Sequence, residues 1–252
     1  MKMLKPPISR MGGKSKLRKQ IIELIPKHIC YVEVFFGAGW VYFGKETSNT
    51  EVINDIDSEL INLFKMIKYH EEEVSRLLEY EIFSRDSFDY YLNQDSKYLT
   101  EIQRAVRFLY IIGCSFGAKG KHFGYGATRK PTQKIFNEDL KVIRDRLKNT
   151  YVENLNFKTL IEKYDREGTF FFCDPPYWKT CGYDNPFTWK NHLELKNTLL
   201  NIKGKFLLTL NDCPQIRELY KEFNILETEV MYTVSKSEKG IKKHNELIIT
   251  NY

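Results

Sequence analysis

Short apolar runs alternate with helix-like periodicity along most of this chain. Strands are predicted at five runs of apolar, aromatic or β-branched residues: Tyr31–Phe35, Glu51–Asp55, Thr169–Cys173, Phe206–Leu210 and Glu246–Thr250. Apolar residues at helical spacing follow the second strand (Leu60, Leu63, Phe64 and Ile67) and recur at Leu193–Leu200 and Ile216–Phe223. Strands alternating with helices are typical of a parallel α/β sheet.

The middle of the chain has a different pattern. Residues 68–112 combine helical periodicity with many charges, and Gly113–Pro131 contains five glycines, which predicts an irregular loop. Glycine flexibility beside basic and aromatic side chains suits a loop that lies against a ligand. We therefore expect residues 61–149 to form an inserted, mainly helical module, and residues 1–60 and 150–252 to form one α/β domain.

The composition supports a folded, intracellular protein. The 252 residues are 42% hydrophobic, enough for one large domain or a domain with an inserted module. The longest apolar runs are far shorter than a membrane span, and the chain opens without a charged-then-apolar leader. Five cysteines form no C-x-x-C pair, which favours idle thiols over disulfides or zinc. We expect a cytoplasmic protein with no membrane segment and no metal site.

The distribution of charge points to a polyanionic partner. The formal net charge is only +6, but no acidic residue occurs from Ile102 to Asn137. Seven basic residues fall in that stretch: Arg104, Arg107, Lys119, Lys121, Arg129, Lys130 and Lys134. A second basic cluster follows near the C-terminus: Lys236, Lys239, Lys242, Lys243 and His244. One-signed stretches of this kind favour nucleic-acid binding.

Two candidate binding patterns follow the first two predicted strands. Phe36-Gly37-Ala38-Gly39 can turn sharply and let the backbone approach a nucleotide-like ligand, although Tyr42 stands where a dinucleotide fingerprint has its third glycine. Asp55 can accept hydrogen bonds from both ribose hydroxyls. An ordinary turn or helix cap explains Asp55 equally well, and Asp57 or Ser58 can cap the following helix.

The third pattern is Asp174-Pro175-Pro176-Tyr177, directly after a wholly apolar predicted strand. The prolines fix the backbone and remove two amide donors, so carbonyl groups point outward. The Asp174 carboxylate and the Pro175 carbonyl can together accept an exocyclic NH2 group while Tyr177 stacks on its ring. Such a site suits a base flipped out of a duplex, although the same four residues can form a plain turn.

In this order, the patterns resemble the Dam-like, D12-class N6-adenine DNA methyltransferases, the α-group amino-methylases that use S-adenosylmethionine. The resemblance spans nearly the whole chain and is carried by Gly12–Lys14, Phe36–Gly39, Asn54–Asp57, Asp174–Tyr177, Leu210–Asp212, Ile216–Tyr220 and Asn245–Tyr252. It implies a Rossmann-like S-adenosylmethionine-dependent methyltransferase sheet with an inserted target-recognition domain at residues 61–149.

The resemblance also implies roles for individual residues. The cofactor would contact Arg10, Lys14, Phe36, Gly37, Gly39, Asp55, Asn156, Phe157 and Asp174. Asn156 and Asp57 depart from the family pattern, in which an acidic residue is common at the first position and asparagine at the second. Catalysis would fall to Asp174, Pro175, Pro176 and Tyr177. DNA would contact Ser115, Lys119, Lys121, His122, Tyr125, Arg129 and Lys130, in a loop similar to a phage-type recognition module.

The expected reaction is direct methyl transfer from S-adenosylmethionine to N6 of a flipped adenine in double-stranded DNA, with no cysteine acting as nucleophile. Recognition of GATC is not supported, because the loop lacks the asparagine- and arginine-bearing pattern of enzymes that methylate it. The alternatives are cytosine N4, adenine in RNA, an inactive DNA-binding relative and, least favoured, a nicotinamide oxidoreductase. The resemblance further implies a bacterial or phage-encoded monomer, either solitary or paired with a restriction endonuclease.

Overall fold

The computed structural model describes residues 3–10, 12–124, 139–179, 187–233 and 241–252, with side chains at 230–244 left undescribed. Contacts divide the chain into two compact units. The first contains Met1–Gly13, Gly37–Lys45 and Asp57–Asn154. The second contains Lys14–Phe36, Glu46–Ile56 and Leu155–Tyr252.

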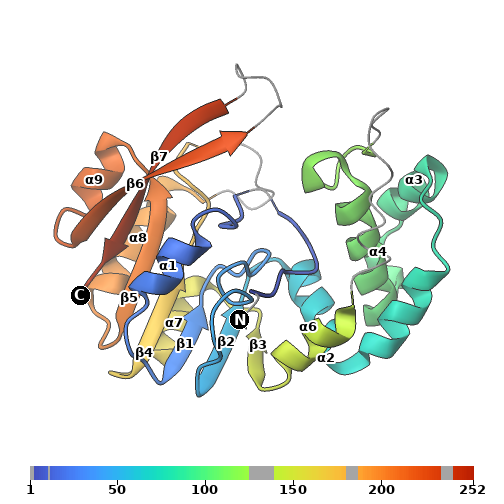
Figure 1. Ribbon diagram of the computed structural model, residues 1–252, viewed down its shortest axis with the longest axis horizontal. Helices are drawn as coiled ribbons and strands as arrows, with labels where there is room; N and C mark the ends of the chain where they lie inside the picture. Colours follow the sequence, from blue (N-terminus) through green and yellow to red (C-terminus); the bar gives the residue numbers. More distant parts are fainter. Residues whose placement is uncertain (1–2, 11, 125–138, 180–186, 234–240) are drawn as a thin grey trace. The chain divides into compact units, whose positions relative to one another are not determined.

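A mainly parallel sheet forms the centre of the second unit (Figure 1). Its strands are β1 (Cys30–Glu33), β2 (Thr50–Asn54), β4 (Thr169–Cys173), β5 (Lys205–Asn211), β6 (Asn224–Thr233) and β7 (Ile241–Thr250). They lie in the order β2-β1-β4-β5-β7-β6. Neighbours among β2, β1, β4 and β5 are parallel, and β7 runs antiparallel to both β5 and β6. This Rossmann-like arrangement confirms the predicted α/β fold.

Strand β4 is buried throughout and mostly apolar because both faces of the sheet are covered at its position. On one face, Phe171 of β4 and Phe206 of β5 belong to a core that includes Leu195 and Leu199. The helices that contribute to this core are α7 (Phe157–Tyr164), α8 (Trp189–Leu200) and α9 (Pro214–Leu219). Phe170 and Phe172 alternate to the other face and are also buried. The Leu24 carbonyl, at the end of helix α1 (Arg18–Leu24), accepts a hydrogen bond from the Tyr252 hydroxyl.

The first unit is built mainly from helices. They are α2 (Ser58–Glu79), α3 (Arg85–Asn93), α4 (Glu101–Cys114) and α6 (Leu140–Leu147), with short 3-10 turns η1 (Ser96–Tyr98) and η2 (Phe116–Ala118) and strand β3 (Thr150–Glu153). The Asp57 side chain caps α2 by accepting from the Glu59 and Leu60 amides. Among the described helices, none has the length and apolar character needed to cross a bilayer.

Three sequence-based expectations need correction. The glycine-rich loop begins later than predicted, because α4 continues through Gly113 to Cys114 and keeps its apolar face buried. Helix α9 ends at Leu219 rather than Phe223. Strands β3 and β6 were not predicted; β6 mixes polar and apolar residues and pairs only with β7 among the strands of its unit.

One polar side chain lies unpaired in the core of the second unit. His192 of α8 is fully buried, and neither ring nitrogen has a hydrogen-bond partner among the described residues. Phe187 lies 4.7 Å from His192 between ring centroids, and Trp178 and Trp189 pack at 6.0 and 6.1 Å. Burial in this aromatic surrounding lowers the pKa of His192 to about 4.

We expect this histidine to make the protein sensitive to mild acid. Below the ordinary histidine pKa, His192 is protonated in the unfolded chain but stays neutral in the folded protein. The free energy of unfolding therefore falls as the pH drops from about 6.5 towards 4. The loss contributed by His192 reaches about 2 kcal/mol at pH 5. Urea unfolding at pH 7 and pH 5 should show a smaller pH effect in His192→Leu than in the wild type. An unchanged pH effect in His192→Leu would contradict the prediction.

Candidate functional site

The candidate site begins where the chain reverses direction across the sheet. Strand β1 has β2 on one side and β4 on the other, so the carboxyl ends of β1 and β4 form a topological switch point, where open α/β sheets bind ligands. The Val34 amide donates to the Phe172 carbonyl at 2.9 Å just beyond β1. The Asn54 side chain donates to the Val34 and Leu155 carbonyls at 2.9 and 3.1 Å, which fixes the backbone around the crevice.

Asp174 follows β4 at this switch point and is held through one oxygen. Lys14 Nζ lies 2.7 Å from Asp174 Oδ1, and the Thr209 hydroxyl donates to the same oxygen at 2.7 Å. No described residue bonds to Asp174 Oδ2, and 17% of the surface of this side chain is exposed. The carboxylate is therefore anchored at one oxygen and has the other available for a ligand donor.

Burial and charge act in opposite directions on this carboxyl. Burial raises the pKa of Asp174 above its ordinary value, and the nearby Glu246 charge adds to that rise. The Lys14 ammonium and the Thr209 hydroxyl act the other way by favouring the ionised form. Burial also raises the pKa of the adjacent Cys173 thiol, which disfavours a reactive thiolate there.

Tyr177 lies within the same side-chain network. Lys14 Nζ is 4.7 Å from the centroid of the Tyr177 ring, and the Tyr177 hydroxyl donates to Glu246 Oε2 at 2.5 Å. The structure thus brings Lys14, Asp174 and Tyr177 together. Thr209 and Glu246 were missed. Each is a single polar residue within or beside an apolar strand, at Phe206–Leu210 and Glu246–Thr250, and Glu246 also falls within Asn245–Tyr252, one of the segments that carry the resemblance.

The glycine segment adopts the backbone that its sequence predicts. Gly37 and Gly39 have φ of +52° and +76°, in the left-handed region that favours glycine. A Cβ atom added to Gly37 would meet nothing within 4 Å, so its backbone is open to close approach. Phe36, in the second unit, donates its amide to the Asn54 carbonyl at 2.8 Å.

The other predicted cofactor residues have different local roles. Arg10 pairs with Asp57 at 2.9 Å and lies 5.9 Å from the Phe108 ring centroid. Asp55 follows β2 directly and is partly exposed. The Asn156 side chain caps α7 by accepting from the Lys158 amide at 2.9 Å. Phe157, the first residue of α7, is buried in the sheet core.

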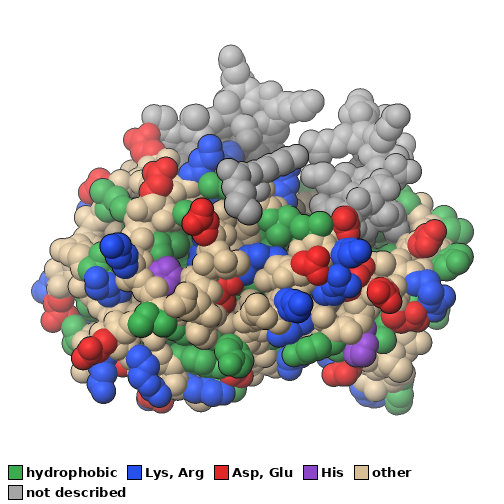
Figure 2. All heavy atoms as spheres, turned by 60° about the horizontal axis from the view of Figure 1, so that its bottom comes forward, with side chains coloured by type: hydrophobic (Ala, Val, Ile, Leu, Met, Phe, Trp, Pro, Cys, Tyr) green, Lys and Arg blue, Asp and Glu red, His purple; other side chains and the backbone are tan. Residues whose placement is uncertain are grey.

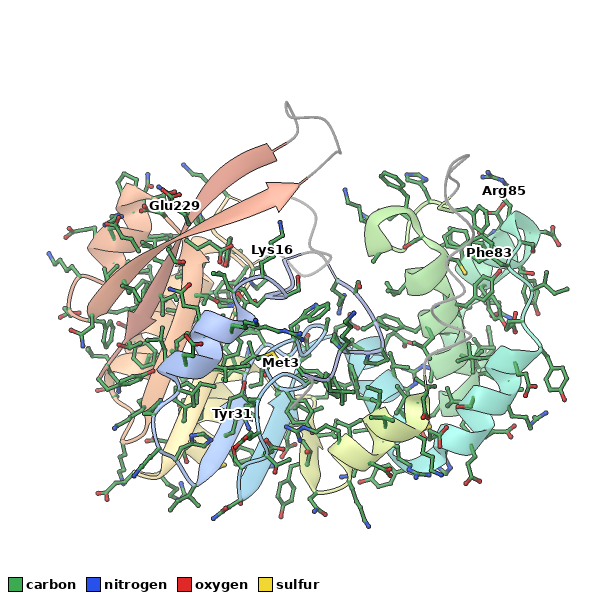
Figure 3. All side chains as sticks on the ribbon, viewed as in Figure 1. Met3, Lys16, Tyr31, Phe83, Arg85 and Glu229 are labelled. Atoms are coloured by element: carbon green, nitrogen blue, oxygen red, sulfur yellow. The ribbon has the colours of Figure 1, made fainter. Side chains whose placement is uncertain are left out.

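The loop after α4 is a compact structure stabilised by its own hydrogen bonds. The Ser115 hydroxyl donates to the Ile112 carbonyl and accepts from the Gly120 amide, at 3.0 and 2.9 Å. Phe123 packs on Phe83 at 5.0 Å between ring centroids, and Arg85 lies 5.3 Å from the Phe123 centroid. Figure 3 labels Phe83 and Arg85 beside this loop.

The predicted DNA-binding residues fall into three groups. The Lys119, Lys121 and His122 side chains are exposed, whereas Ser115 is buried. Tyr125, Arg129 and Lys130 lie outside the described residues, as does the lysine-rich cluster between β6 and β7 apart from the backbone of Lys242–His244.

Not every basic residue in the acid-free stretch is available to a ligand. Arg104 donates to the Glu59 carboxylate through Nε and Nη2, the latter at 2.5 Å, and Arg107 donates to the Tyr91 carbonyl at 2.7 Å. These two arginines therefore stabilise the first unit itself. On the face drawn in Figure 2, basic and acidic side chains of the described residues are interspersed.

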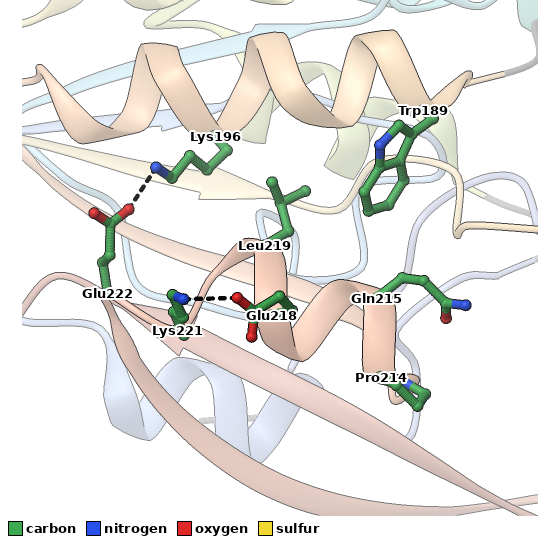
Figure 4. A pocket seen from close by; sticks show the side chains of 8 residues that line it. All are labelled: Trp189, Lys196, Pro214, Gln215, Glu218, Leu219, Lys221 and Glu222. Carbon is green, nitrogen blue, oxygen red and sulfur yellow. Dashed lines mark hydrogen bonds and ion pairs between the residues drawn. The ribbon is translucent and has the colours of Figure 1, made fainter.

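A shallow hollow of about 690 Å³ lies between α8 and α9 (Figure 4). Its charged residues pair with one another: Lys196 bonds to Glu222, and Lys221 Nζ lies 2.6 Å from Glu218 Oε1. None of the predicted site residues lines it. Among the described residues, no cluster of histidine, cysteine and acidic side chains is arranged to hold a metal ion.

Comparison with known proteins agrees with the geometry. Residues 11–234 match the model of the D12 class N6 adenine-specific DNA methyltransferases. The Type II methyltransferase M1.LlaDCHI of Lactococcus lactis subsp. cremoris is 29% identical, over 99% of this chain and 96% of the relative. DNA adenine methylase of Escherichia coli strain K12 is 26% identical, over 94% and 91%. Type II methyltransferase M.CviBI of Paramecium bursaria Chlorella virus NC1A is 26% identical, over 91% of each chain. The chain therefore belongs to the family of D12 class N6 adenine-specific DNA methyltransferases.

Proposed function

We propose that this protein transfers a methyl group from S-adenosylmethionine to N6 of an adenine flipped out of double-stranded DNA. The observation that carries the proposal is the state of Asp174 at the end of β4. Its Oδ1 is held by Lys14 and Thr209, and its Oδ2 has no partner among the described residues. The match of the chain to the adenine methyltransferase family supports the same reaction.

The residues present fit a nucleoside-bearing cofactor. Gly37 has open space in front of its backbone, and the switch point at the ends of β1 and β4 is where such folds bind nucleotides. In this proposal Asp55 binds the ribose hydroxyls of the cofactor. Phe36, Gly37 and Gly39 pack along its methionine and ribose. The remaining assigned contacts are Arg10, Lys14, Asn156, Phe157 and Asp174. When bound, S-adenosylmethionine supplies an electrophilic methyl group.

The protein's part in catalysis is to orient the amine. Adenine's NH2 lone pair is delocalised into the ring, so the group is a weak nucleophile. Hydrogen bonds from NH2 to Asp174 Oδ2 and the Pro175 carbonyl favour a more tetrahedral nitrogen and direct its lone pair at the methyl carbon. Pro176 keeps the backbone rigid, and Tyr177 stacks on the base. On transfer, the electron pair of the broken methyl–sulfur bond would pass to sulfur and the N6 proton to water. Alignment and electrostatics would supply most of the rate.

We assign DNA binding to the inserted module, residues 61–149. Lys119, Lys121 and His122 present exposed groups in its loop, where they can contact phosphates or base edges. Ser115 would act through the loop shape that its hydroxyl fixes. Tyr125, Arg129 and Lys130 complete the proposed DNA contacts. The proposal also covers a cytoplasmic monomer, with a partner restriction endonuclease where one is encoded.

The test is methyl transfer from labelled S-adenosylmethionine to unmethylated genomic DNA, followed by sequencing of the modified base. We expect N6-methyladenine at one short motif other than GATC. N4-methylcytosine, or transfer to RNA alone, would replace the proposed substrate. A protein that binds the cofactor in calorimetry but modifies neither nucleic acid would be an inactive relative.

A further inference from the structure

A second buried carboxylate lies beside Asp174 but outside the D-P-P-Y segment. Glu246 of β7 is only 2% exposed and lies opposite Asn211 of β5 in the antiparallel register. Directly opposed residues point to the same face of a sheet, and Thr209 shares that face because it is two residues from Asn211. Thr209 is the residue that holds Asp174. The fold therefore brings Glu246 to the end of β4.

Glu246 contacts the aromatic residue of the D-P-P-Y segment directly. The Tyr177 hydroxyl donates to Glu246 Oε2 at 2.5 Å, within the range of short hydrogen bonds to an ionised acceptor. Lys14 Nζ lies 3.9 Å from the same oxygen and 2.7 Å from Asp174 Oδ1. It also lies 4.7 Å from the Tyr177 ring centroid. The ring and the carboxylate acceptor are thus fixed by one connected network.

The contact to Glu246 fixes the side chain of Tyr177, which the two prolines do not constrain. Pro175 and Pro176 fix the backbone that leads to Tyr177, but the side chain still turns about its own bonds. A charged acceptor at the hydroxyl removes that freedom before any ligand arrives. A ring ordered in advance stacks on a base without a further loss of conformational entropy.

We propose that Glu246 is a positioning residue that acts through Tyr177, holding its ring in the orientation that stacks on the flipped adenine. The inference rests on the proposed function and adds to it a residue of β7. Neither Glu246 nor Thr209 belongs to the set that the sequence assigned to the site. In this role Glu246 touches neither substrate nor cofactor and acts through the Tyr177 hydroxyl.

The experiment compares Glu246→Leu, Glu246→Gln, Tyr177→Phe and the double variant Tyr177→Phe/Glu246→Leu on a duplex carrying the mapped motif. Glutamine keeps an oxygen that accepts from the hydroxyl, leucine keeps only bulk, and phenylalanine keeps only the ring. A duplex with 2-aminopurine at the target adenine reports base stacking by fluorescence, independently of turnover. Glu51→Leu is the matched control, because Glu51, near the start of β2, is also buried and accepts from the Ser48 amide at 3.2 Å.

We expect Glu246→Leu and Tyr177→Phe each to lower kcat about 30-fold, the effect of losing one hydrogen bond to a charged group. Both variants should reduce the change in 2-aminopurine fluorescence that the wild type produces on binding the duplex. The kcat of Glu246→Gln should stay within about threefold of the wild-type value. The double variant should be no slower than the slower single variant, because both changes break the same contact. Glu51→Leu should leave kcat and the fluorescence signal unchanged.

Wild-type turnover is measured first, so that failure of the proposed function can be distinguished from failure of this inference. An inactive wild type overturns both proposals. With an active wild type, normal kcat in Glu246→Leu overturns this inference alone. Losses that multiply in the double variant overturn it as well, because Glu246 then acts by another route. If Glu246→Leu does not fold, wild-type kcat and 2-aminopurine fluorescence in Tyr177→Phe overturn it.

Discussion

Asp174→Ala is expected to lower methyl transfer by about 1,000-fold while the sheet stays folded. The change removes the acceptor that orients the amine, and losing one such electrostatic group typically costs two to three orders of magnitude in kcat. It also removes the carboxylate that lies 2.7 Å from Lys14 Nζ. Steady-state transfer to the mapped duplex measures kcat, and circular dichroism checks the fold.

Asp165→Ala is the matched control for this prediction. Asp165 also lies in the second unit, directly after α7, and its carboxylate accepts from the Lys203 and Gly204 amides at 2.9 Å each. Its loss should lower stability without lowering kcat. Near-normal turnover in Asp174→Ala would refute the assigned role, whatever the behaviour of the control.

Lys14→Met is expected to destabilise the protein by about 3–5 kcal/mol at neutral pH, because it leaves buried carboxylates without their ammonium partner. Lys14 is 4% exposed and lies 2.7 Å from Asp174 and 3.9 Å from Glu246. The pKa of Asp174 is already raised by burial, and removing the Lys14 charge raises it further.

A carboxyl whose pKa is higher in the folded state loses stability as the pH rises through that pKa, because the folded protein must release its proton there. The deficit of Lys14→Met should therefore be larger at pH 8 than at pH 5 in urea unfolding. Lys196→Met is the control: it removes a lysine paired with the exposed Glu222, and such pairs contribute at most about 1 kcal/mol. Equal deficits of Lys14→Met at both pH values would contradict the prediction.

Local sequence patterns predicted much of the fold. The run Thr169–Cys173 forms β4 with the predicted limits, because five consecutive apolar or β-branched residues suit a strand covered on both faces. Strand β1 ends two residues earlier than predicted, at Glu33, since an aromatic run alone does not show where the sheet ends. Helix α4 continued through Gly113 because burial of its apolar face outweighed the low helix propensity of glycine.

The pattern of charge along the sequence did not show which basic side chains are available to a partner. Arg104 and Arg107 fall in the acid-free stretch, yet each is bound within the first unit, by Glu59 and by the Tyr91 carbonyl. Charge along a chain does not show which side chains face a partner, because an acidic residue far away in sequence can neutralise a basic one. Lys119 and Lys121 of the same stretch are exposed.

By itself, the sequence determined the α/β rhythm, the glycine turn after the first strand and the Asp174–Tyr177 segment at the end of β4, since these depend on residues adjacent in the chain. Only the tertiary structure decided what surrounds Asp174. Lys14, Thr209 and Glu246 come from widely separated segments, and they meet there because parallel strands end at one edge of the sheet and β7 returns antiparallel beside β5. Hydrogen bonds and ion pairs act over a few ångströms of space, whatever the separation along the chain.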